Sequence, residues 1–359
     1  MNVATLKRCV LLIALTGAPL ASEPYHWDLP KGFPRPRVPA GNPMSEAKVK
    51  LGRYLFYDTR LSVSGTFSCA SCHKQELAFT DGRVAPIGAT GESHSRSAMT
   101  LVNVAYSSVL TWSDPGMRSL ETQALVPMLG EHPVELGLRG REHDVIAMLR
   151  AQPVYHDLFP QAFPGDQDVF TLKNVANALA SFERTIISAR SPWDRFHTGG
   201  DQEAISESAK RGEVVFFNGQ NGGQCLRCHN GFNLSDATES GPEFHNTALY
   251  NLPGLFSYPQ PNLGIYSHTK KPSDVGKFKA PTLRNIALTA PYMHDGSIAT
   301  LEGVIEHYAS GGRAHDNPNR DARMATISLT RQNKLDLLEF LRSLTDTELI
   351  HDPRFSNPW

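Results

Sequence analysis

The 359-residue sequence predicts a mainly α-helical protein of two domains with long irregular loops. Several segments repeat apolar residues at intervals of three and four positions, and no stretch of useful length alternates apolar with polar residues. The pentapeptide Cys-X-X-Cys-His occurs twice, at 69–73 and 225–229. Because this length accommodates two ordinary domains, one motif in each half predicts a second domain that partly repeats the first.

Each Cys-X-X-Cys-His motif is the attachment signature of a c-type haem. The thiols of Cys69 and Cys72, and those of Cys225 and Cys228, can each add to a vinyl group of one porphyrin. The axial iron ligands are then His73 and His229. A four-cysteine zinc site and a thioredoxin-type redox pair are the alternatives, but structural zinc motifs usually have short spacings. We therefore expect two covalently bound haem c groups in two cytochrome-c-like domains.

Residues 1–22 have the pattern of a secretory signal peptide. Lys7 and Arg8 precede an apolar run that ends in small residues, so we expect cleavage near residues 21–22 and a periplasmic protein. The run is about half the roughly 20 residues that a membrane span needs. Cys9 leaves with the signal and the other cysteines all lie in the haem motifs, so no disulfide is predicted. The net charge of −1 gives no reason to expect nucleic acid or an acidic membrane as a partner.

The predicted N-terminal domain, 23–165, contains the first haem motif. Its proline-rich start, 23–44, is expected to wrap the surface in extended form. Ser45 is a candidate N-cap of a helix that leads to the motif, and 144–149 is helical by the same spacing. The apolar side of the first helix is formed by Val49, Leu51, Leu55 and Phe56.

The predicted C-terminal domain, 166–345, contains the second haem motif and is followed by a tail, 346–359. Thr300 is a candidate N-cap of a helix whose inner face includes Leu301, Val304, Ile305 and Tyr308. The segment 230–281 is rich in Gly, Pro, Asn and Ser and is expected to be irregular. Further helices are expected over 171–188, 203–217 and 330–344, with a connector at 190–200.

Several motifs outside the haem signatures resemble the bacterial dihaem cytochrome c peroxidase and MauG superfamily. They are Trp112 between the two signatures and the segments 120–127, 133–137, 280–285 and 288–297, and the similarity covers essentially the whole mature chain. Three further segments, 130–137, 244–247 and 352–359, look most like the MbnH branch. That branch is linked to oxidation of tryptophan to kynurenine in a copper-binding partner, MbnP.

The resemblance implies that the first haem is open to peroxide. Peroxidases that rest inactive have a distal His in a Gly-His pair eight residues before the Asn of an Arg-Asn pair. Here these positions are Ala89, after Gly88, and Ser97, after Arg96. No blocking His is present at that position, so a five-coordinate iron is expected. His94 lies nearby and is a rival ligand.

The resemblance also assigns residues to the distal side of the first haem. Glu135 matches the family's acid, which moves the peroxide proton. Gln123 would hydrogen-bond the bound oxygen, and Pro127 would form a dry wall of the pocket. Because this chain has two extra residues between Pro127 and Glu135, Glu131 is a rival for the acid.

Tyr308, fourteen residues after His294, lies where peroxidases have Met and MauG has Tyr. A phenolate is a hard anionic donor that favours ferric iron, so it predicts storage of oxidising equivalents; an ordinary buried tyrosine is the alternative. Trp112 matches the tryptophan between the haems, and Trp193 and Trp359 are candidate relays to the surface. MauG carries a further tryptophan two residues before its second haem motif, and in this chain that position is Gly223.

The superfamily further implies a calcium ion between the domains, with Ser97, Thr289 and Pro291 at the matching positions. Serine is a poorer ligand than the family's asparagine amide, although calcium accepts mixed oxygen ligands.

We therefore expect a periplasmic dihaem oxidase that uses hydrogen peroxide to oxidise a tryptophan of an MbnP-like protein. One alternative is a dihaem cytochrome c peroxidase that takes electrons from a small redox protein. Another is a dihaem electron carrier without catalytic activity, which requires two six-coordinate irons.

Overall fold

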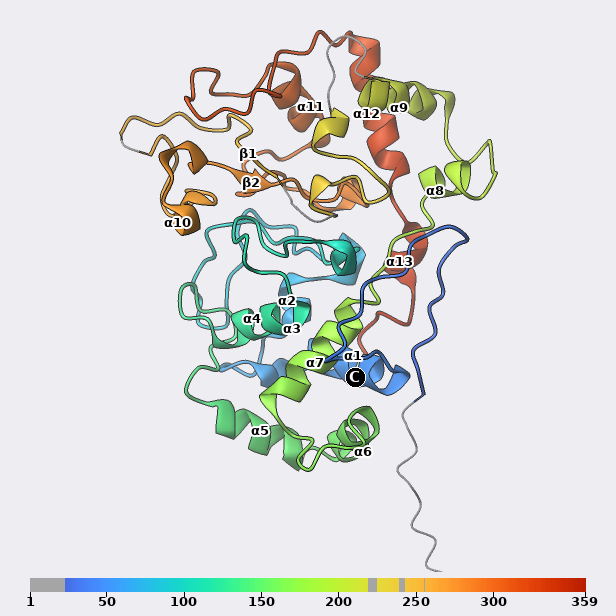
Figure 1. The fold of residues 1–359 in the computed structure, drawn as a ribbon, viewed down its shortest axis with the longest axis vertical. Helices are drawn as coiled ribbons and strands as arrows, with labels where there is room; N and C mark the ends of the chain where they lie inside the picture. Colours follow the sequence, from blue (N-terminus) through green and yellow to red (C-terminus); the bar gives the residue numbers. More distant parts are fainter. Residues whose placement is uncertain (1–22, 219–224, 239–242, 255) are drawn as a thin grey trace, which may run out of the picture.

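The computed structural model describes residues 23–218, 225–238, 243–254 and 256–359. The predicted signal peptide and Gly223 lie outside these residues. The described chain is mainly helical, as the sequence predicts, with two short strands. Figure 1 shows two lobes stacked along the long axis, with α1 to α7 in one lobe and α8 to α12 with both strands in the other. None of the described helices is long and apolar enough to cross a membrane.

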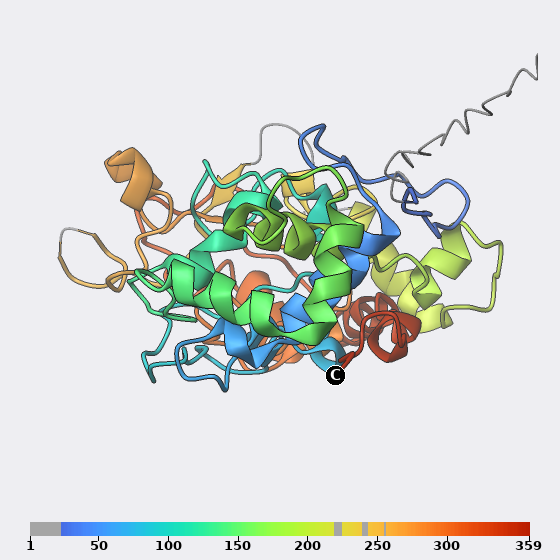
Figure 2. The same cartoon turned by 90° about the horizontal axis from the view of Figure 1, so that it is seen from below.

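The first lobe is built around two crossing helices, α1 (Glu46–Tyr57) and α7 (Leu172–Glu183). Figures 1 and 2 both show the blue α1 beside the green α7. The crossing is close because Gly52 of α1 has no side chain; a Cβ there would lie 2.0 Å from the carbonyl oxygen of Ala178. Ser45 caps α1 as predicted, accepting a hydrogen bond from the Lys48 N–H.

Helix α7 ends at Glu183, earlier than the predicted 171–188, because the N–H groups of residues 185–187 bond carbonyls only two or three residues back. The Ser188 N–H donates to Asn103, and the Ala189 and Arg190 N–H groups donate to Asp346. The packing of α7 on α1 also joins residues from both sides of the expected boundary at 165. Leu349 and Phe355 of the tail belong to the same apolar core.

The second lobe repeats this arrangement with α9 (Glu207–Asn218) and α12 (Arg331–Ser343), which pack side by side. Gly212 of α9 faces the carbonyl oxygen of Asp336 as Gly52 faces Ala178. Helix α9 begins later than predicted because the Ser206 hydroxyl accepts the Ala209 N–H at its start. Helix α12 lies within the predicted 330–344, and Thr330 caps it.

Several helices occur where the sequence predicts none, among them α6 (Pro153–Ala162) and α8 (Pro192–His197). These two start with proline, which needs no hydrogen bond for its nitrogen in the first turn. In the α8 start, Ser191 and Asp194 bond each other's backbone N–H groups. The remaining α-helices are α2 (Cys69–Cys72), α3 (Leu120–Gln123), α4 (Leu125–Leu129), α5 (Glu142–Ala151), α10 (Tyr266–Thr269), α11 (Leu301–Ala309) and α13 (Thr347–His351).

The segment 230–281 is largely irregular, as expected. It contains one antiparallel pair of two-residue strands, β1 (Phe244–His245) and β2 (Phe278–Lys279), in which Phe244 is opposite Lys279. Short 3₁₀ turns complete the described chain: η1 (Thr59–Leu61), η2 (Gln75–Leu77), η3 (Val104–Tyr106), η5 (Cys225–Arg227), η6 (Asp236–Thr238), η7 (Pro272–Asp274) and η8 (Ile286–Leu288).

Candidate active site

The first haem motif folds as a helical turn that ends in a fixed histidine. The turn α2 brings Cys69 and Cys72 to one side, and neither thiol forms a disulfide. The Nδ1 of His73 is 2.9 Å from the carbonyl oxygen of Phe79. An N–H at Nδ1 leaves Nε2 with a free lone pair, and burial lowers the pKa of His73, so the imidazole is neutral.

The second motif repeats this geometry. The Nδ1 of His229 is 3.1 Å from the carbonyl oxygen of Leu234, and burial lowers its pKa also. Phe79 and Leu234 have φ values of 61° and 50°, a left-handed conformation that bulky residues rarely adopt. The same local strain therefore aims a carbonyl at each histidine. Unpaired thiols and a neutral imidazole with a free Nε2 fit covalently attached haem in both lobes.

A cavity of about 210 Å³ adjoins the second motif. Cys225, Cys228 and His229 line it together with Tyr308, which α11 carries into the same space. Burial raises the pKa of the Tyr308 hydroxyl. The walls are mainly apolar and include Trp112. Tyr308 thus faces the cavity that holds the second motif, where an axial ligand would have to lie.

The distal residues expected at the first motif come from α3, α4 and the loop that follows. Gln123 ends α3, and its buried Oε1 has no hydrogen-bond partner, so this polar atom is available to a ligand. The Leu136 N–H donates to the carbonyl oxygen of Pro127 at 2.9 Å, which folds the Glu135 loop back onto α4. Burial, with smaller effects from Asp81 and then Glu135, raises the pKa of Cys72 to about 11, so Glu135 lies near the first motif.

Glu135 is the acid that the structure keeps near the first motif. Burial raises its pKa to about 7, which suits a group that must both accept and release a proton at neutral pH. Its rival Glu131 instead pairs with Arg139 at 3.1 Å, and both side chains are about 60% exposed (59% and 60%). Glu131 therefore points to solvent.

The loop around Ala89 is held against the Glu135 loop. The Ala89 N–H donates to the carbonyl oxygen of Glu135 at 2.7 Å. Gly88 permits this contact, because a Cβ there would lie 2.0 Å from the carbonyl oxygen of Val134. His94, the rival iron ligand, has both nitrogens directed at the protein: Nδ1 faces the Arg96 N–H at 3.1 Å, and Nε2 lies 3.8 Å from Glu135 Oε1.

Trp112 contacts both the Ser97 segment and the cavity of the second motif. Its indole N–H donates to the carbonyl oxygen of Ser97 at 3.0 Å, while its ring lines the cavity of the second motif. The two candidate relays, Trp193 and Trp359, lie elsewhere. Trp193 donates to Glu213 at 2.8 Å, and Trp359, which is 51% exposed, donates to the carbonyl oxygen of Tyr54. Their role as relays stays a prediction.

The three expected calcium positions lie in two segments that meet at one point. The Ser97 N–H donates to the carbonyl oxygen of His294, three residues beyond Pro291. The Ser97 carbonyl accepts from Trp112, and the Thr289 hydroxyl donates to its own turn at Ile286. A calcium ion at Ser97, Thr289 and Pro291 stays a prediction.

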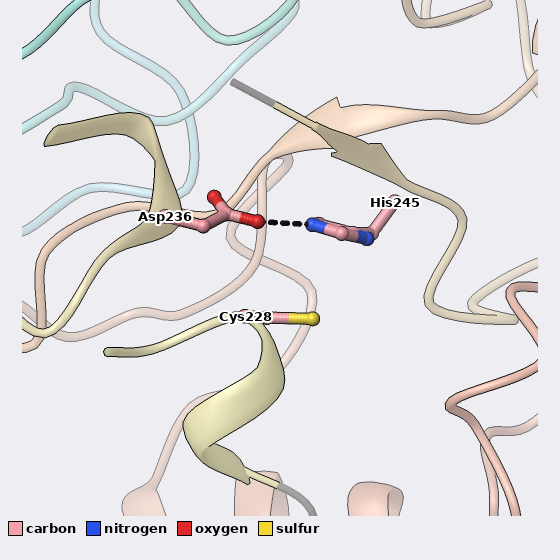
Figure 3. A group of neighbouring side chains, drawn as sticks. All are labelled: Cys228, Asp236 and His245. Atoms are coloured by element: carbon pink, nitrogen blue, oxygen red, sulfur yellow. Dashed lines mark hydrogen bonds and ion pairs between the residues drawn. The ribbon is translucent and has the colours of Figure 1, made fainter. Parts of the chain in front are cut away.

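Figure 3 shows a polar group beside the second motif that the sequence analysis assigned no role. Cys228, Asp236 and His245 offer ligand atoms within 4.8 Å of one another. His245 also pairs with Asp321, and these carboxylates raise its pKa to about 11 despite burial. Because the Cys228 sulfur is needed for haem attachment, we interpret this group as a buried ion pair at the haem edge rather than a separate metal site. The sequence offered one indication of this group: His245 lies in the segment 244–247, which resembles the MbnH branch.

Comparisons with known proteins give consistent matches. The family model for di-haem cytochrome c peroxidase matches residues 46–203. The methylamine utilization protein MauG of Methylophilus methylotrophus is 36% identical, over 93% of this chain and 94% of that protein. A cytochrome-c peroxidase of Denitromonas iodatirespirans is also 36% identical, over 88% of this chain and 86% of its own.

A solved structure described as a MauG-like protein associated with microbial copper homeostasis is 44% identical to this chain. It superposes with a TM-score of 0.89 and covers 93% of this chain and 99% of its own.

Proposed function

Because the chain belongs to the di-haem cytochrome c peroxidase and MauG family of enzymes, with two haem c groups, we propose that it uses hydrogen peroxide to oxidise a tryptophan of a protein partner. The proposed partner is a periplasmic copper-binding protein of the MbnP type, and the product is kynurenine. The copper association of the MauG-like structural relative supports this choice.

The position of Tyr308 carries the proposal. Its hydroxyl side chain lines the same cavity as His229, where a peroxidase of this family would have methionine. A phenolate stabilises oxidised iron, whereas a thioether favours the reduced state in which a centre receives electrons. The second centre is therefore suited to holding oxidising equivalents.

The haems, when bound, supply the iron that cleaves peroxide and stores its two oxidising equivalents. The chain's own residues prepare the first site for this reaction. Glu135 accepts the proton from one peroxide oxygen and returns it to the leaving oxygen, which departs as water. The unpaired Gln123 Oε1 accepts a hydrogen bond from the O–H of the peroxide and so orients it, and Pro127 keeps the wall dry.

Trp112 would carry oxidising equivalents between the two sites, since its ring lines the cavity of the second motif and its N–H is bonded to the segment that holds His94 and Ser97. The partner's tryptophan is then oxidised at the protein surface. Opening the indole between C2 and C3 to formylkynurenine removes four electrons, so two peroxides are consumed per tryptophan. Hydrolysis of the formyl group then gives kynurenine and formate.

The test is to add peroxide to the diferric protein and follow both irons by Mössbauer spectroscopy. The proposal predicts that both irons leave the ferric state without any added reductant. If one iron stays ferric and turnover requires a reduced small cytochrome, the enzyme is instead a peroxidase. Two six-coordinate ferric irons that ignore peroxide would indicate an electron carrier.

The partner is tested separately. An MbnP-like protein incubated with the enzyme and peroxide should gain the mass of formylkynurenine or kynurenine at one tryptophan. If the partner stays unmodified while peroxide still oxidises both irons, the proposed oxidase activity stands and this protein is not its substrate.

A further inference from the structure

A histidine that the reaction scheme does not use lies beside the proposed acid. His94 Nε2 is 3.8 Å from Glu135 Oε1, and both side chains are partly exposed. We propose that His94 is a positioning residue, a neutral imidazole whose Nε2–H points at Glu135 Oε1, favours the ionised carboxylate and leaves Oε2 to handle the peroxide protons. This inference rests on the proposed role of Glu135.

The backbone fixes which nitrogen of His94 carries the proton. Nδ1 lies 3.1 Å from the N–H of Arg96, which can only donate, so Nδ1 must accept. The proton of the neutral ring is therefore on Nε2, which faces Glu135. The separation of 3.8 Å closes to a hydrogen bond by a small shift or by one bridging water, and such contacts are often long before substrate binds.

Backbone hydrogen bonds hold the segments that carry His94 and Glu135. The His94 N–H donates to the carbonyl oxygen of Pro86 at 2.8 Å. Asn262 bonds the next two residues, donating to the Ser95 carbonyl at 2.7 Å and accepting from the Arg96 guanidinium at 3.0 Å. On the other side, the Glu135 carbonyl accepts from Ala89. The His94–Glu135 contact is thus built into two anchored loops.

This anchoring also prevents His94 from acting as a proton carrier. A second proton on the ring would have to displace the Arg96 N–H from Nδ1. Burial and the positive charge of Arg96 lower the pKa of His94, so the ring stays neutral. A group that only donates stabilises the carboxylate form of Glu135 and opposes the desolvation that raises the pKa of that carboxyl.

Few other titratable groups face this pair among the described residues. Arg96 is on the His94 loop, and Glu92 accepts the Val134 N–H from the neighbouring turn. The sulfurs of Cys69 and Cys72 also lie near Glu135, but as thioethers in the haem-bound protein they do not titrate. Glu183, whose pKa burial raises to about 8, also lies near Cys69, so the Glu135→Gln variant is needed to assign the pH dependence near neutrality to Glu135.

The test is the pH profile of peroxide consumption by the haem-loaded enzyme. The wild-type rate should rise with pH through the pKa of Glu135, because the carboxylate is the active form. His94→Ala should move this rise to higher pH. Below the rise, the variant should lose about tenfold in rate for each pH unit that separates its midpoint from that of wild type, and above the rise the two rates should be equal. His94→Gln, which keeps an N–H donor, should restore much of the wild-type profile.

Three outcomes would overturn the inference. A His94→Ala profile that superimposes on wild type would remove the positioning role. A change of the ferric spectrum from low spin to high spin in His94→Ala would show that His94 is an iron ligand instead. Glu135→Gln should abolish the rise; if it does not, the proposed role of Glu135 fails and that of His94 with it. If the rise is absent in Glu135→Gln but the His94→Ala profile equals that of wild type, the role of Glu135 stands and only the positioning role of His94 is rejected.

Discussion

Gly52 decides how closely the two helices beneath the first haem motif approach, and its replacement by alanine tests the packing of the first lobe. A Cβ at this position would lie 2.0 Å from the Ala178 oxygen and 2.8 Å from the Phe182 Cβ. Ordinary contacts between such atoms are about 3.5–4.0 Å, so the helices must separate. Overpacking of this kind costs about 1–3 kcal/mol or more.

Helix propensity alone makes the opposite prediction for Gly52→Ala. Alanine is more favourable than glycine in a helix interior by about 1 kcal/mol, so an exposed helix would become more stable. The steric cost should exceed this gain because a backbone carbonyl, which cannot rotate away, is the closest atom. We therefore expect a net loss of about 1–2 kcal/mol or more in the free energy of unfolding.

Urea unfolding followed by circular dichroism measures this loss. Gly165→Ala is the matched control, since a Cβ there meets nothing within 4 Å. Gly212→Ala should behave like Gly52→Ala, because its Cβ would lie 1.9 Å from the Asp336 oxygen. A Gly52→Ala protein as stable as wild type, with an unchanged Gly165→Ala control, would refute the packing of α1 on α7.

Three further substitutions test the two haem sites and one buried ion pair, Arg284–Asp194. Glu135→Gln should slow peroxide consumption by about 10²–10⁴-fold in stopped-flow measurements, because an amide cannot accept the peroxide proton; a wild-type rate would assign that proton to another group. Tyr308→Phe should remove the phenolate-to-iron band from the ferric visible spectrum and leave the second iron five-coordinate, whereas an identical spectrum would make Tyr308 an ordinary buried tyrosine. Arg284→Met should cost about 3–5 kcal/mol in urea unfolding by leaving the buried Asp194 carboxylate unpaired. Adding Asp194→Asn should recover part of that loss, and a single variant as stable as wild type would contradict the buried pair.

The helices that the sequence predicted well are those whose signals lie within the helix and its cap. Ser45 and Thr330 each bond a backbone N–H three residues later, so α1 and α12 begin where local chemistry places them. Helices α6 and α8 were not predicted; each begins with proline, and α8 lies in the segment expected to be a connector. The end of α7 was also misplaced, and the segment that follows it is held by Asn103 and Asp346, which are distant in sequence.

The site shows the same division between local and distant information. The haem anchors could be predicted because both thiols and the histidine lie within five consecutive residues. The carbonyl groups that orient His73 and His229 could not, since a backbone acceptor carries no residue signature. The approach of His94 to Glu135 depends on how two loops meet, and no spacing in the sequence indicates it.

The two motifs are anchored alike, so the difference between the two centres must arise on their distal sides. Each proximal histidine is neutral and bonded to the carbonyl of a residue with left-handed backbone. The first centre faces Glu135, which can exchange protons near neutral pH, and the second faces Tyr308, whose burial disfavours a free phenolate. A phenolate there is stable only when it binds a metal cation, so the same burial that raises its pKa favours oxidised iron. Under the proposed function, distal side chains rather than the anchors would therefore separate a centre that reacts with peroxide from one that stores its oxidising equivalents.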